Sequence, residues 1–262
     1  MKPVIKYQGG KSKELPLIKQ LLPQKFNRVV EPFCGGAAVS FGLQTPALLS
    51  DINPMVINLY KVLQSSDFVG VLHRINVMKS YEHDALQEAY YAARDVINKP
   101  DNFTPLIQAV SYIIVRQLCF SGMERYNSDG KFNVPFGHYK QLSCNLSPDH
   151  HQFLNKCEIA LSSFDDTLSS VNDDDFVFID PPYLERLGYT EGDGGLALHS
   201  KLHTILSAVK APWMIIHSDH EFYREYYKDF NIQEKDFAYA QRFGKGKDHS
   251  GAKVKHLYIT NY

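Results

Sequence analysis

Four consecutive residues, Asp180-Pro181-Pro182-Tyr183, place two hydrogen-bond acceptors and an aromatic ring directly after an apolar run. The run, residues 176–179, has the length and the β-branched and aromatic content of a buried parallel strand. Asp180 therefore falls at the carboxyl end of this strand, where open α/β sheets bind their ligands. Because proline has no N–H to donate, the two prolines stop the strand and hold the Pro181 carbonyl in a fixed direction beside the Asp180 carboxylate.

Two acceptors beside a flat ring suit an aromatic amine such as adenine. The lone pair of an exocyclic amino nitrogen is delocalised into its ring, which makes this nitrogen a poor nucleophile. Asp180 and Pro181 could each accept one of its N–H bonds and aim the lone pair at a methyl donor, and positioning of this kind lowers a barrier. Tyr183 would stack on a base turned out of its helix. A strand ending in a proline-rich turn explains the tetrad alone equally well.

The chain as a whole has the size and composition of a globular α/β protein. Its 262 residues suffice for one large domain, or for one domain with an insertion. Hydrophobic content of 44% and charged content of 22% are ordinary values. There is no apolar run of membrane-spanning length and no signal peptide, and the 4 cysteines lack CxxC pairing. We therefore expect a cytoplasmic protein with reduced thiols and no membrane association.

The net charge of −1 neither indicates nor excludes nucleic-acid binding, because the electrostatic footprint of such a site is local. Basic residues gather near both ends of the chain, at Lys2, Lys6, Lys11 and Lys13 and again at Arg242, Lys245, Lys247, Lys253 and Lys255. Acidic residues collect elsewhere, as at residues 173–175. This distribution suits a protein with one basic cleft, although a solvated surface explains any single lysine as well.

Two glycine-rich turns precede the tetrad. The first, residues 7–11 (YQGGK), allows the backbone to approach a ligand closely, and Ser12 is expected to cap a helix that runs to about Leu22. The second lies within residues 28–39, which predict a strand, a glycine turn and a helix, the opening unit of a nucleotide-binding sheet. It lacks the GxGxxG pattern, which argues against a nicotinamide cofactor.

An acidic residue ends the next expected strand. Residues 47–50 form this strand, and Asp51 follows at its tip. A carboxylate placed about 20 residues after a glycine turn can hydrogen-bond ribose hydroxyls. Asp51 can also cap the helix that follows through Val56, and one residue at that tip could do both. We favour the ribose role.

Four segments, taken in order, resemble the Dam-type (D12 class) DNA adenine N6-methyltransferases. They are residues 7–11 (YQGGK), 31–36 (EPFCGG), 51–54 (DINP) and 180–183 (DPPY). The cofactor turn precedes the catalytic tetrad, as in the alpha arrangement of such enzymes. Each motif is loose alone, but the ordered set is specific and spans nearly the whole chain. The resemblance implies an α/β fold, with a Rossmann-like S-adenosylmethionine-dependent methyltransferase sheet and an inserted, mainly helical target-recognition domain.

The segment between residues 60 and 157 has helical periodicity, as expected of such an insertion. Near its end, two short extended runs flank residues 127–130 (NSDG) and predict a β-hairpin near residues 122–138. A hairpin that carries Arg125 and Lys131 can enter a DNA groove, where arginine is the usual bidentate reader of guanine.

The resemblance assigns Arg125 to base contact, whereas a solvated arginine on a surface hairpin is the alternative. Phage relatives in this family carry a further basic reader shortly after the segment that matches Phe136-Gly137. This chain has Tyr139 at that position. The recognition sequence, GATC or another, therefore stays open.

The sheet is expected to resume at residues 157–161. Phe164 follows, and the resemblance makes it a candidate for contact with the cofactor's adenine, although a core aromatic residue is an equal alternative. The polar, glycine-rich stretch from Leu184 to Gly195 predicts a mobile loop that closes over the flipped base. A strand at residues 213–217 precedes a helix that we expect to be capped near Ser218.

Two further features complete the chain. His217 and His220 lack a third ligand at suitable spacing, so we interpret them as core and loop histidines and expect no metal. The basic, glycine-rich residues 242–253 suit phosphate contact, and residues 254–260 are expected to form the last strand.

By resemblance, residues 1–59 and 158–262 form a catalytic methyltransferase domain and residues 60–157 a target-recognition domain. The implied reaction transfers a methyl group from S-adenosylmethionine to adenine N6 of duplex DNA by base flipping. The implied partner is double-stranded DNA, with a cognate restriction endonuclease left open, in a bacterial or phage-infected cytoplasm. The expected catalytic residues are Asp180, Pro181, Pro182 and Tyr183. The expected cofactor-binding residues are Tyr7, Lys11, Phe33, Gly35, Asp51, Phe164 and Asp180. The expected DNA-binding residues are Lys6, Arg125, Lys131, Pro135, Lys245 and Lys247.

Other functions compete with this one. Another planar amine could accept the methyl group: cytosine N4, RNA adenine or a protein glutamine. Cytosine-specific members of the family tend to carry Ser in place of the Asp, and this chain has Asp180. A non-catalytic DNA-binding relative is a further alternative, against which the intact tetrad argues.

Overall fold

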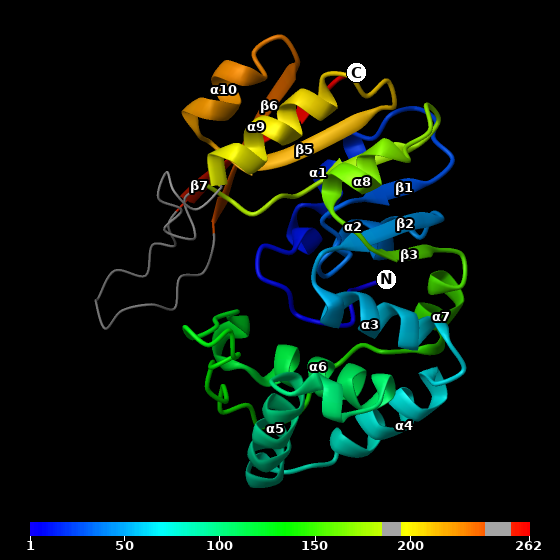
Figure 1. Cartoon of the computed structure of the whole chain (residues 1–262), viewed down its shortest axis with the longest axis vertical. Coiled ribbons are helices and arrows are strands. Elements are labelled where there is room, and N and C mark those ends of the chain that lie inside the picture. Colours follow the sequence, from blue (N-terminus) through cyan, green and yellow to red (C-terminus); the bar gives the residue numbers. More distant parts are fainter. Residues whose placement is uncertain (185–194, 239–252) are drawn as a thin grey trace. The chain divides into compact units, whose positions relative to one another are not determined.

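The computed structural model of the chain describes residues 1–184, 195–238 and 253–262 (Figure 1). In these residues the strands form a seven-stranded, mostly parallel sheet in the order β3-β2-β1-β4-β5-β7-β6. The expected α/β methyltransferase-type sheet is confirmed. The chain also divides into two compact units, Met1–Leu22 with Cys34–Leu161 and Pro23–Phe33 with Ser162–Tyr262. These boundaries differ from the expected domain limits at residues 59 and 158, which stay a prediction.

In the first unit, β2 (Ala47–Asp51) pairs in parallel with β3 (Glu158–Leu161), so that Asp51 lies beside Leu161 at their carboxyl ends. Its α-helices are α1 (Leu15–Gln20), α2 (Ala38–Leu43), α3 (Pro54–Gln64), α4 (Phe68–Met78), α5 (His83–Ile97), α6 (Pro105–Leu118) and α7 (Pro148–Leu154). Single 3-10 turns are η1 (Lys11–Lys13), η2 (Pro100–Asn102) and η3 (Phe120–Gly122). Helix α6 is buried from Ala109 to Leu118, and burying each large apolar side chain there contributes about 1.5–3 kcal/mol.

The expected helix cap at Ser12 is wrong. Ser12 lies inside the 3-10 turn η1, and α1 begins only at Leu15 with Glu14 as its N-cap residue. Pro16 explains the difference, because a proline is tolerated in the first turn of an α-helix but not in its interior.

The segment after α6 forms the expected hairpin only in part. Antiparallel bridges join Cys119 to Phe136 and Tyr126 to Phe132, but they are isolated bridges. The turn is fixed by Asn127, whose side-chain oxygen accepts the backbone N–H groups of Asp129 at 3.1 Å and Lys131 at 2.8 Å.

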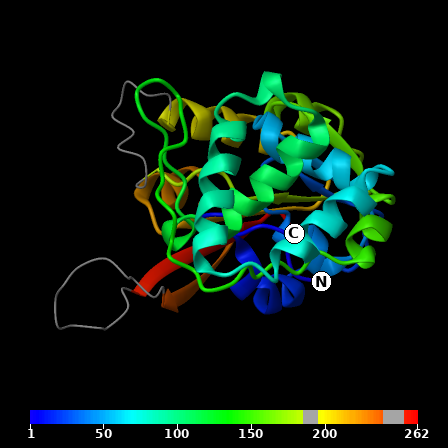
Figure 2. The ribbon, with the colours of Figure 1, turned by 90° about the horizontal axis from the view of Figure 1, so that it is seen from below.

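This segment packs along α5 in place of a long ladder (Figure 2). The Tyr90 hydroxyl donates to the Val134 carbonyl at 2.7 Å, and Asn98 exchanges bonds with the Phe132 backbone at 2.8 and 3.1 Å. The helix therefore supplies the hydrogen bonds that hold the hairpin in its extended form.

In the second unit, β1 (Val29–Glu31), β4 (Phe176–Ile179) and β5 (Trp213–Ser218) pair in parallel, with β4 in the middle. Strands β7 (Lys253–Thr260) and β6 (Asn231–Ala238) continue the sheet antiparallel. All residues of β4 and β5 are buried, as expected of continuous apolar strands covered on both faces. The helices are α8 (Phe164–Ser169), α9 (Gly195–Leu206) and α10 (Glu221–Tyr226), and α9 and α10 lie side by side (Figure 1).

The cap expected near Ser218 is also wrong. Ser218 is the last residue of β5, and the N-cap residue of α10 is His220, whose Nδ1 accepts the N–H of Phe222 at 3.1 Å. In the described part of the chain, no helix has the length and apolar character to cross a membrane. The predicted mobile loop, apart from its ends, and Lys245 and Lys247 of the basic tail lie outside the described residues.

Candidate active site

The tetrad lies where the sequence predicts it, immediately after β4 in the second unit. Asp180 is partly exposed, Pro181 is buried and Pro182 is exposed. Ile179, the last residue of β4, pairs with Ile215 of β5, and β5 continues in the same direction to Ser218. Two parallel strands thus deliver their last residues to one edge of the sheet, which is the usual ligand-binding edge of such folds.

Tyr183 is enclosed by histidines. Its ring centroid lies 4.6 Å from that of His217 and 5.5 Å from that of His256, which meets it edge-on at 82°. Only 9% of Tyr183 is exposed. Stacking of this ring on a flipped base therefore stays a prediction.

Two buried histidines contact the backbone of the tetrad segment. His217, in β5, accepts the N–H of Leu184 at Nε2, 3.2 Å away, and its Nδ1 lies 2.9 Å from the Ser218 carbonyl. The ring of His199, in α9, faces the Pro182 carbonyl, and its Nδ1 lies 2.5 Å from the Tyr223 hydroxyl. Burial lowers the pKa of His217 to about 3 and that of His199 to about 4. Both imidazoles are therefore neutral at physiological pH.

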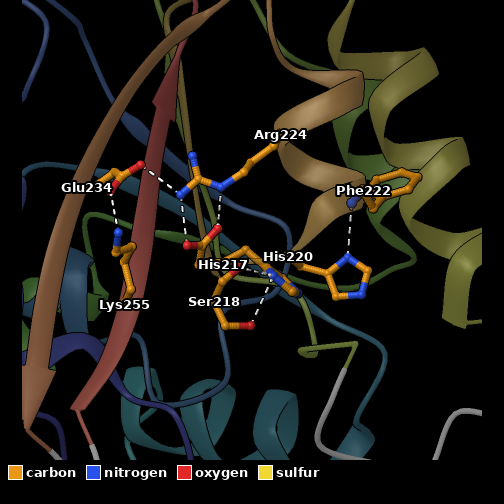
Figure 3. Close-up of polar contacts among 8 residues, drawn as sticks. His217, Ser218, His220, Phe222, Arg224, Glu234 and Lys255 are labelled. Atoms are coloured by element: carbon orange, nitrogen blue, oxygen red, sulfur yellow. Dashed lines mark hydrogen bonds and ion pairs between the residues drawn. The ribbon is translucent and has the colours of Figure 1, made fainter.

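An exposed ion-pair network lies beyond these histidines (Figure 3). Arg224 of α10 bonds to Asp219 at 2.5 and 2.8 Å and to Glu234 of β6 at 2.7 Å. Glu234 also accepts from Lys255 of β7 at 2.7 Å. Exposed ion pairs stabilise a fold little because water screens them, but the network ties α10 to the antiparallel edge of the sheet.

The first unit brings together three of the expected cofactor residues, Tyr7, Gly35 and Asp51. The Asp51 carboxylate accepts the N–H groups of Gly35 and Asn53, both at 2.9 Å. Burial raises the pKa of Asp51, and the bonds from Asn53 and Gly35 oppose this shift. Asn53 caps α3 by accepting the N–H of Met55 at 3.0 Å. Asp51 is thus not the helix cap, and its carboxylate retains lone pairs for a ribose.

The ring of Tyr7 packs against the glycine turn. A Cβ atom on Gly35 would lie 2.5 Å from Cε1 of Tyr7, and one on Gly36 would lie 2.9 Å from its Cβ. Gly35 has a φ of +43°, and its carbonyl accepts the Tyr60 hydroxyl at 2.7 Å. Glycine is thus required here by both the backbone conformation and the tyrosine ring.

A buried arginine supports Tyr7 from α6. Arg116 is 1% exposed, and its guanidinium carbon lies 5.2 Å from the Tyr7 ring centroid. It donates to the Lys6 carbonyl at 3.0 Å and pairs with Glu124 at 3.2 Å. Sequence reasoning missed this residue. The signal was an arginine within the apolar run of α6, because a charged side chain at such a position is buried only where it has partners.

The two lysines expected near the cofactor and the DNA both bond to protein carbonyls. Lys11 is 2% exposed and donates to the Gly9 carbonyl at 2.7 Å. Lys6 donates to the Gln117 carbonyl at 2.8 Å, and its ammonium lies 4.2 Å from the Tyr139 ring centroid. The roles expected for them stay predictions.

In the second unit, the two expected aromatic cofactor residues stack on each other. The ring centroids of Phe33 and Phe164 are 5.3 Å apart, with 21° between the planes. Phe164 opens α8, which Ser163 caps, and Lys201 lies 5.7 Å from its ring.

Arg125 of the hairpin is held by Asn133, which lies on the other side of the turn. Arg125 donates to the Asn133 side chain at 2.7 Å and to the Asn133 carbonyl at 3.2 Å. Both Arg125 and Lys131 are exposed. Pro135 is exposed as well, and its carbonyl accepts the N–H of Phe120 at 2.9 Å. The guanidinium is thus pre-oriented, with further N–H groups for a partner.

The fold and these motifs define a class, the α/β methyltransferases with a glycine turn before the tetrad. A family model described as D12 class N6 adenine-specific DNA methyltransferase matches residues 7–241. The chain belongs to this family. It is accordingly an adenine-specific DNA methyltransferase, as the resemblance of its motifs predicts.

Curated relatives agree with this placement. The chain is 30% identical to the type II methyltransferase M.CviBI of Paramecium bursaria Chlorella virus NC1A, with 100% of each chain covered. It is 31% identical to the retron Ec67 DNA adenine methylase of Escherichia coli, over 88% of this chain and 82% of that one. It is 28% identical to the DNA adenine methylase of Haemophilus influenzae, over 86% and 82%.

Proposed function

We propose that this enzyme transfers the methyl group of S-adenosylmethionine to N6 of an adenine that is flipped out of duplex DNA at a specific sequence. The observation that carries the proposal is the placement of Asp180 and Pro181 at the carboxyl end of the buried strand β4. This position presents a carboxylate and a carbonyl, which are the two acceptors that an exocyclic amine requires.

The first unit has the features that an adenosyl cofactor needs. Asp51, at the tip of β2, is oriented by two backbone N–H groups and keeps lone pairs for ribose hydroxyls. Gly35 lets the backbone come close to a ligand, and the Tyr7 ring fixes the turn. When bound, the cofactor would supply a methyl group on a positively charged sulfur, which departs as a neutral thioether when the methyl group is transferred. We assign Tyr7, Lys11, Gly35 and Asp51 to its binding, with Phe33 and Phe164 for its adenine.

The chain's own residues would act on the target amine. Asp180 and Pro181 each accept one N–H bond, which draws the nitrogen toward tetrahedral geometry and directs its lone pair at the methyl group. Pro182 fixes the turn through its ring, and Tyr183 stacks on the base. A base within a duplex is out of reach of such a site, so flipping is part of the proposal.

We assign DNA recognition to residues 60–157, with contact through the hairpin near residues 122–138. Arg125 is exposed and pre-oriented by Asn133, which suits a bidentate contact to guanine. Lys131 and Pro135 would contact the backbone beside it, and Lys6, Lys245 and Lys247 would add phosphate contacts. The basic residues that gather near both ends of the chain could neutralise phosphates, which supports a duplex substrate.

Partner and location follow the same reasoning. Relatives named type II methyltransferases suggest a restriction endonuclease as a further partner in the cell. The four cysteines all lie in the described residues as buried thiols outside any disulfide, which supports the expectation of a cytoplasmic enzyme.

The test of the function is incorporation of labelled methyl from S-adenosylmethionine into unmethylated plasmid DNA, followed by nucleoside digestion and mass analysis. Label in N6-methyladenine is expected, and the modified positions give the recognition sequence. Label in N4-methylcytosine would make cytosine the target base on the same fold. Label only in RNA or in protein glutamine would make that molecule the substrate in place of DNA. A protein that binds DNA and transfers no methyl group to any of these would be a non-catalytic relative.

The cofactor assignment has its own test. Asp51→Asn replaces one of the two acceptor oxygens with an NH2 donor. This donor would face a backbone N–H and disturb the position of the side chain, so cofactor affinity is expected to fall at least about tenfold. Asp67→Asn, an exposed position before α4, is the matched control and should bind the cofactor like wild type. Equal affinities in the two variants would contradict the ribose role of Asp51.

A further inference from the structure

The turn that carries the catalytic acceptors has few backbone donors of its own. Pro181 and Pro182 have no N–H, so the first donors after Asp180 are those of Tyr183 and Leu184. The N–H of Leu184 donates to Nε2 of His217 at 3.2 Å, and the ring of His199 faces the Pro182 carbonyl. Two side chains from other elements, β5 and α9, therefore contact this turn.

We propose that His199 and His217 are positioning residues, which hold the backbone of residues 180–184 so that the Asp180 carboxylate and the Pro181 carbonyl face the target amine together. The inference rests on the proposed function, since it gives this histidine pair a role in the same methyl transfer.

The bonds of His217 fix its tautomer. His217 accepts at Nε2, so its proton lies on Nδ1, which is 2.9 Å from the Ser218 carbonyl. Nδ1 of His199 lies 2.5 Å from the Tyr223 hydroxyl, which holds that ring in place beside the turn. A proton on Nε2 of His217 would face the N–H of Leu184 and break the contact.

Packing locks both rings in place. His217 stacks on Tyr223, with centroids 4.1 Å apart, and His199 meets His217 edge-on at 5.3 Å. The titratable groups that face the pair are His220 and Tyr223 of α10 and its cap, His256 of β7, and Asp180 and Tyr183 of the turn itself. Burial in this apolar and aromatic surrounding favours the neutral rings that the geometry requires.

The backbone geometry explains how a clamp on Pro182 reaches the Pro181 carbonyl. The peptide planes on either side of Pro182 are related by two dihedrals, and the proline ring fixes φ near −65°. Only ψ of Pro182 remains soft. The His199 ring beside the Pro182 carbonyl and the bond from the Leu184 N–H to His217 restrict this ψ, and with it the direction of the Pro181 carbonyl.

Three variants of the full-length enzyme separate positioning from packing. His217→Phe keeps the ring and loses the acceptor, whereas His217→Gln keeps an acceptor that can reach Leu184. His203→Phe is the matched control, because His203 lies one turn after His199 on α9 and its ring packs on Tyr226 of α10 and on Tyr227, which follows that helix. For each variant, kcat, KM for DNA, the dissociation constant for S-adenosylmethionine and the exchange rate of the Leu184 amide are measured.

The three variants are expected to differ in kcat and in the exchange rate of the Leu184 amide. His217→Phe is expected to lower kcat about 10- to 100-fold with KM and cofactor affinity nearly unchanged, because a misplaced acceptor weakens the oriented complex. The Leu184 amide should exchange faster in this variant. His217→Gln should restore most of kcat and the amide protection, and His203→Phe should match wild type. Equal kcat in His217→Phe and His203→Phe would overturn the proposal.

Two further measurements keep the outcome decisive. If His217→Phe fails to fold, the nitrogen NMR signals of the wild-type ring decide: a protonated Nδ1 and a bare Nε2 support the clamp, and the opposite tautomer overturns it. Asp180→Ala separates this inference from the proposed function. An inactive Asp180→Ala with an active His217→Phe defeats only the clamp, whereas an active Asp180→Ala defeats the catalytic assignment itself.

Discussion

The carboxylate of Asp51 accepts the backbone N–H of Gly35 at 2.9 Å, which ties the tip of β2 to the glycine turn 16 residues earlier. The opposite oxygen accepts the N–H of Asn53, so the carboxylate is held between two fixed donors. The Tyr7 ring covers the same turn, at a distance that leaves no room for a side chain on Gly35. The part of the site that we propose for the cofactor is therefore a preformed arrangement of backbone and side chain.

Gly35→Ala is the direct test of this arrangement. The new methyl group would lie 2.5 Å from Tyr7, at a φ of +43°, so we expect a loss of about 1–3 kcal/mol in unfolding free energy and weaker cofactor binding. Gly130→Ala is the control, because Gly130 has a φ of +72° but no described atom within 4 Å of its Cβ position. Urea unfolding of both variants isolates the clash, and equal losses would show that Tyr7 plays no part.

Arg116 provides a second prediction, on stability. Arg116→Met is expected to lower the unfolding free energy by about 1–3 kcal/mol, because the partly buried bonds to the carbonyls of Lys6 and Met123 lose their donor. Glu124→Gln should cost less, since Glu124 is 20% exposed and water can replace the ion pair. Denaturant titration of both variants checks the order. A larger loss in Glu124→Gln than in Arg116→Met would contradict this view of the contact.

The hairpin predicts two kinds of DNA contact. Arg125→Ala should weaken binding to the cognate sequence by about 1–3 kcal/mol and affect other sequences much less, because its guanidinium would read a base. Lys131→Ala should weaken binding to all sequences and reduce the salt dependence, because a phosphate contact releases counterions. Binding isotherms on cognate and scrambled duplexes at several salt concentrations distinguish them. Identical effects of both substitutions would remove the base-reading role of Arg125.

Much of the site follows from local sequence patterns. An apolar run that ends in Asp180 and two prolines predicts both the buried strand and the position of the tetrad. The same holds for Asp51 after residues 47–50 and for the glycine turn before it. These features depend on residues adjacent in the chain, which is why they can be recognised without the fold.

Other residues could not be found in this way, because their roles come from packing. Arg116 bonds to Lys6, 110 positions away, and His217 bonds to Leu184, 33 positions away. The misplaced helix caps have a local cause. Pro16 delays the start of α1, and His220 supplies a cap that its ring nitrogen makes possible, neither of which a preference for serine anticipates.

The histidine pair predicts the sign of a pH effect on stability. The pKa of His217 falls from 6.5 to about 3 and that of His199 to about 4, so between these values and 6.5 the unfolded chain binds more protons than the folded one. Unfolding free energy should therefore rise with pH across this window, by up to about 1.4 kcal/mol per pH unit for each histidine. Asp51 has a raised pKa, so its contribution to the unfolding free energy falls as pH rises from its ordinary pKa of 3.8, which is the opposite sign.

Urea unfolding between pH 4.5 and 7.5 measures this slope. His199→Gln combined with His217→Gln should flatten it, because neither glutamine titrates, and His203→Gln should leave it unchanged. A double variant with the wild-type slope would show that other groups carry the pH dependence.

The central claim is that Asp180 orients the target amine for methyl transfer, and one comparison tests it most directly. Single-turnover methylation of a cognate duplex is measured for wild type and for Asp180→Ala, alongside the affinity of each for the same DNA. The account predicts N6-methyladenine from wild type, none from Asp180→Ala, and DNA affinities within about threefold of each other, because the loss concerns positioning and not binding. Wild-type-like turnover in Asp180→Ala would contradict the account.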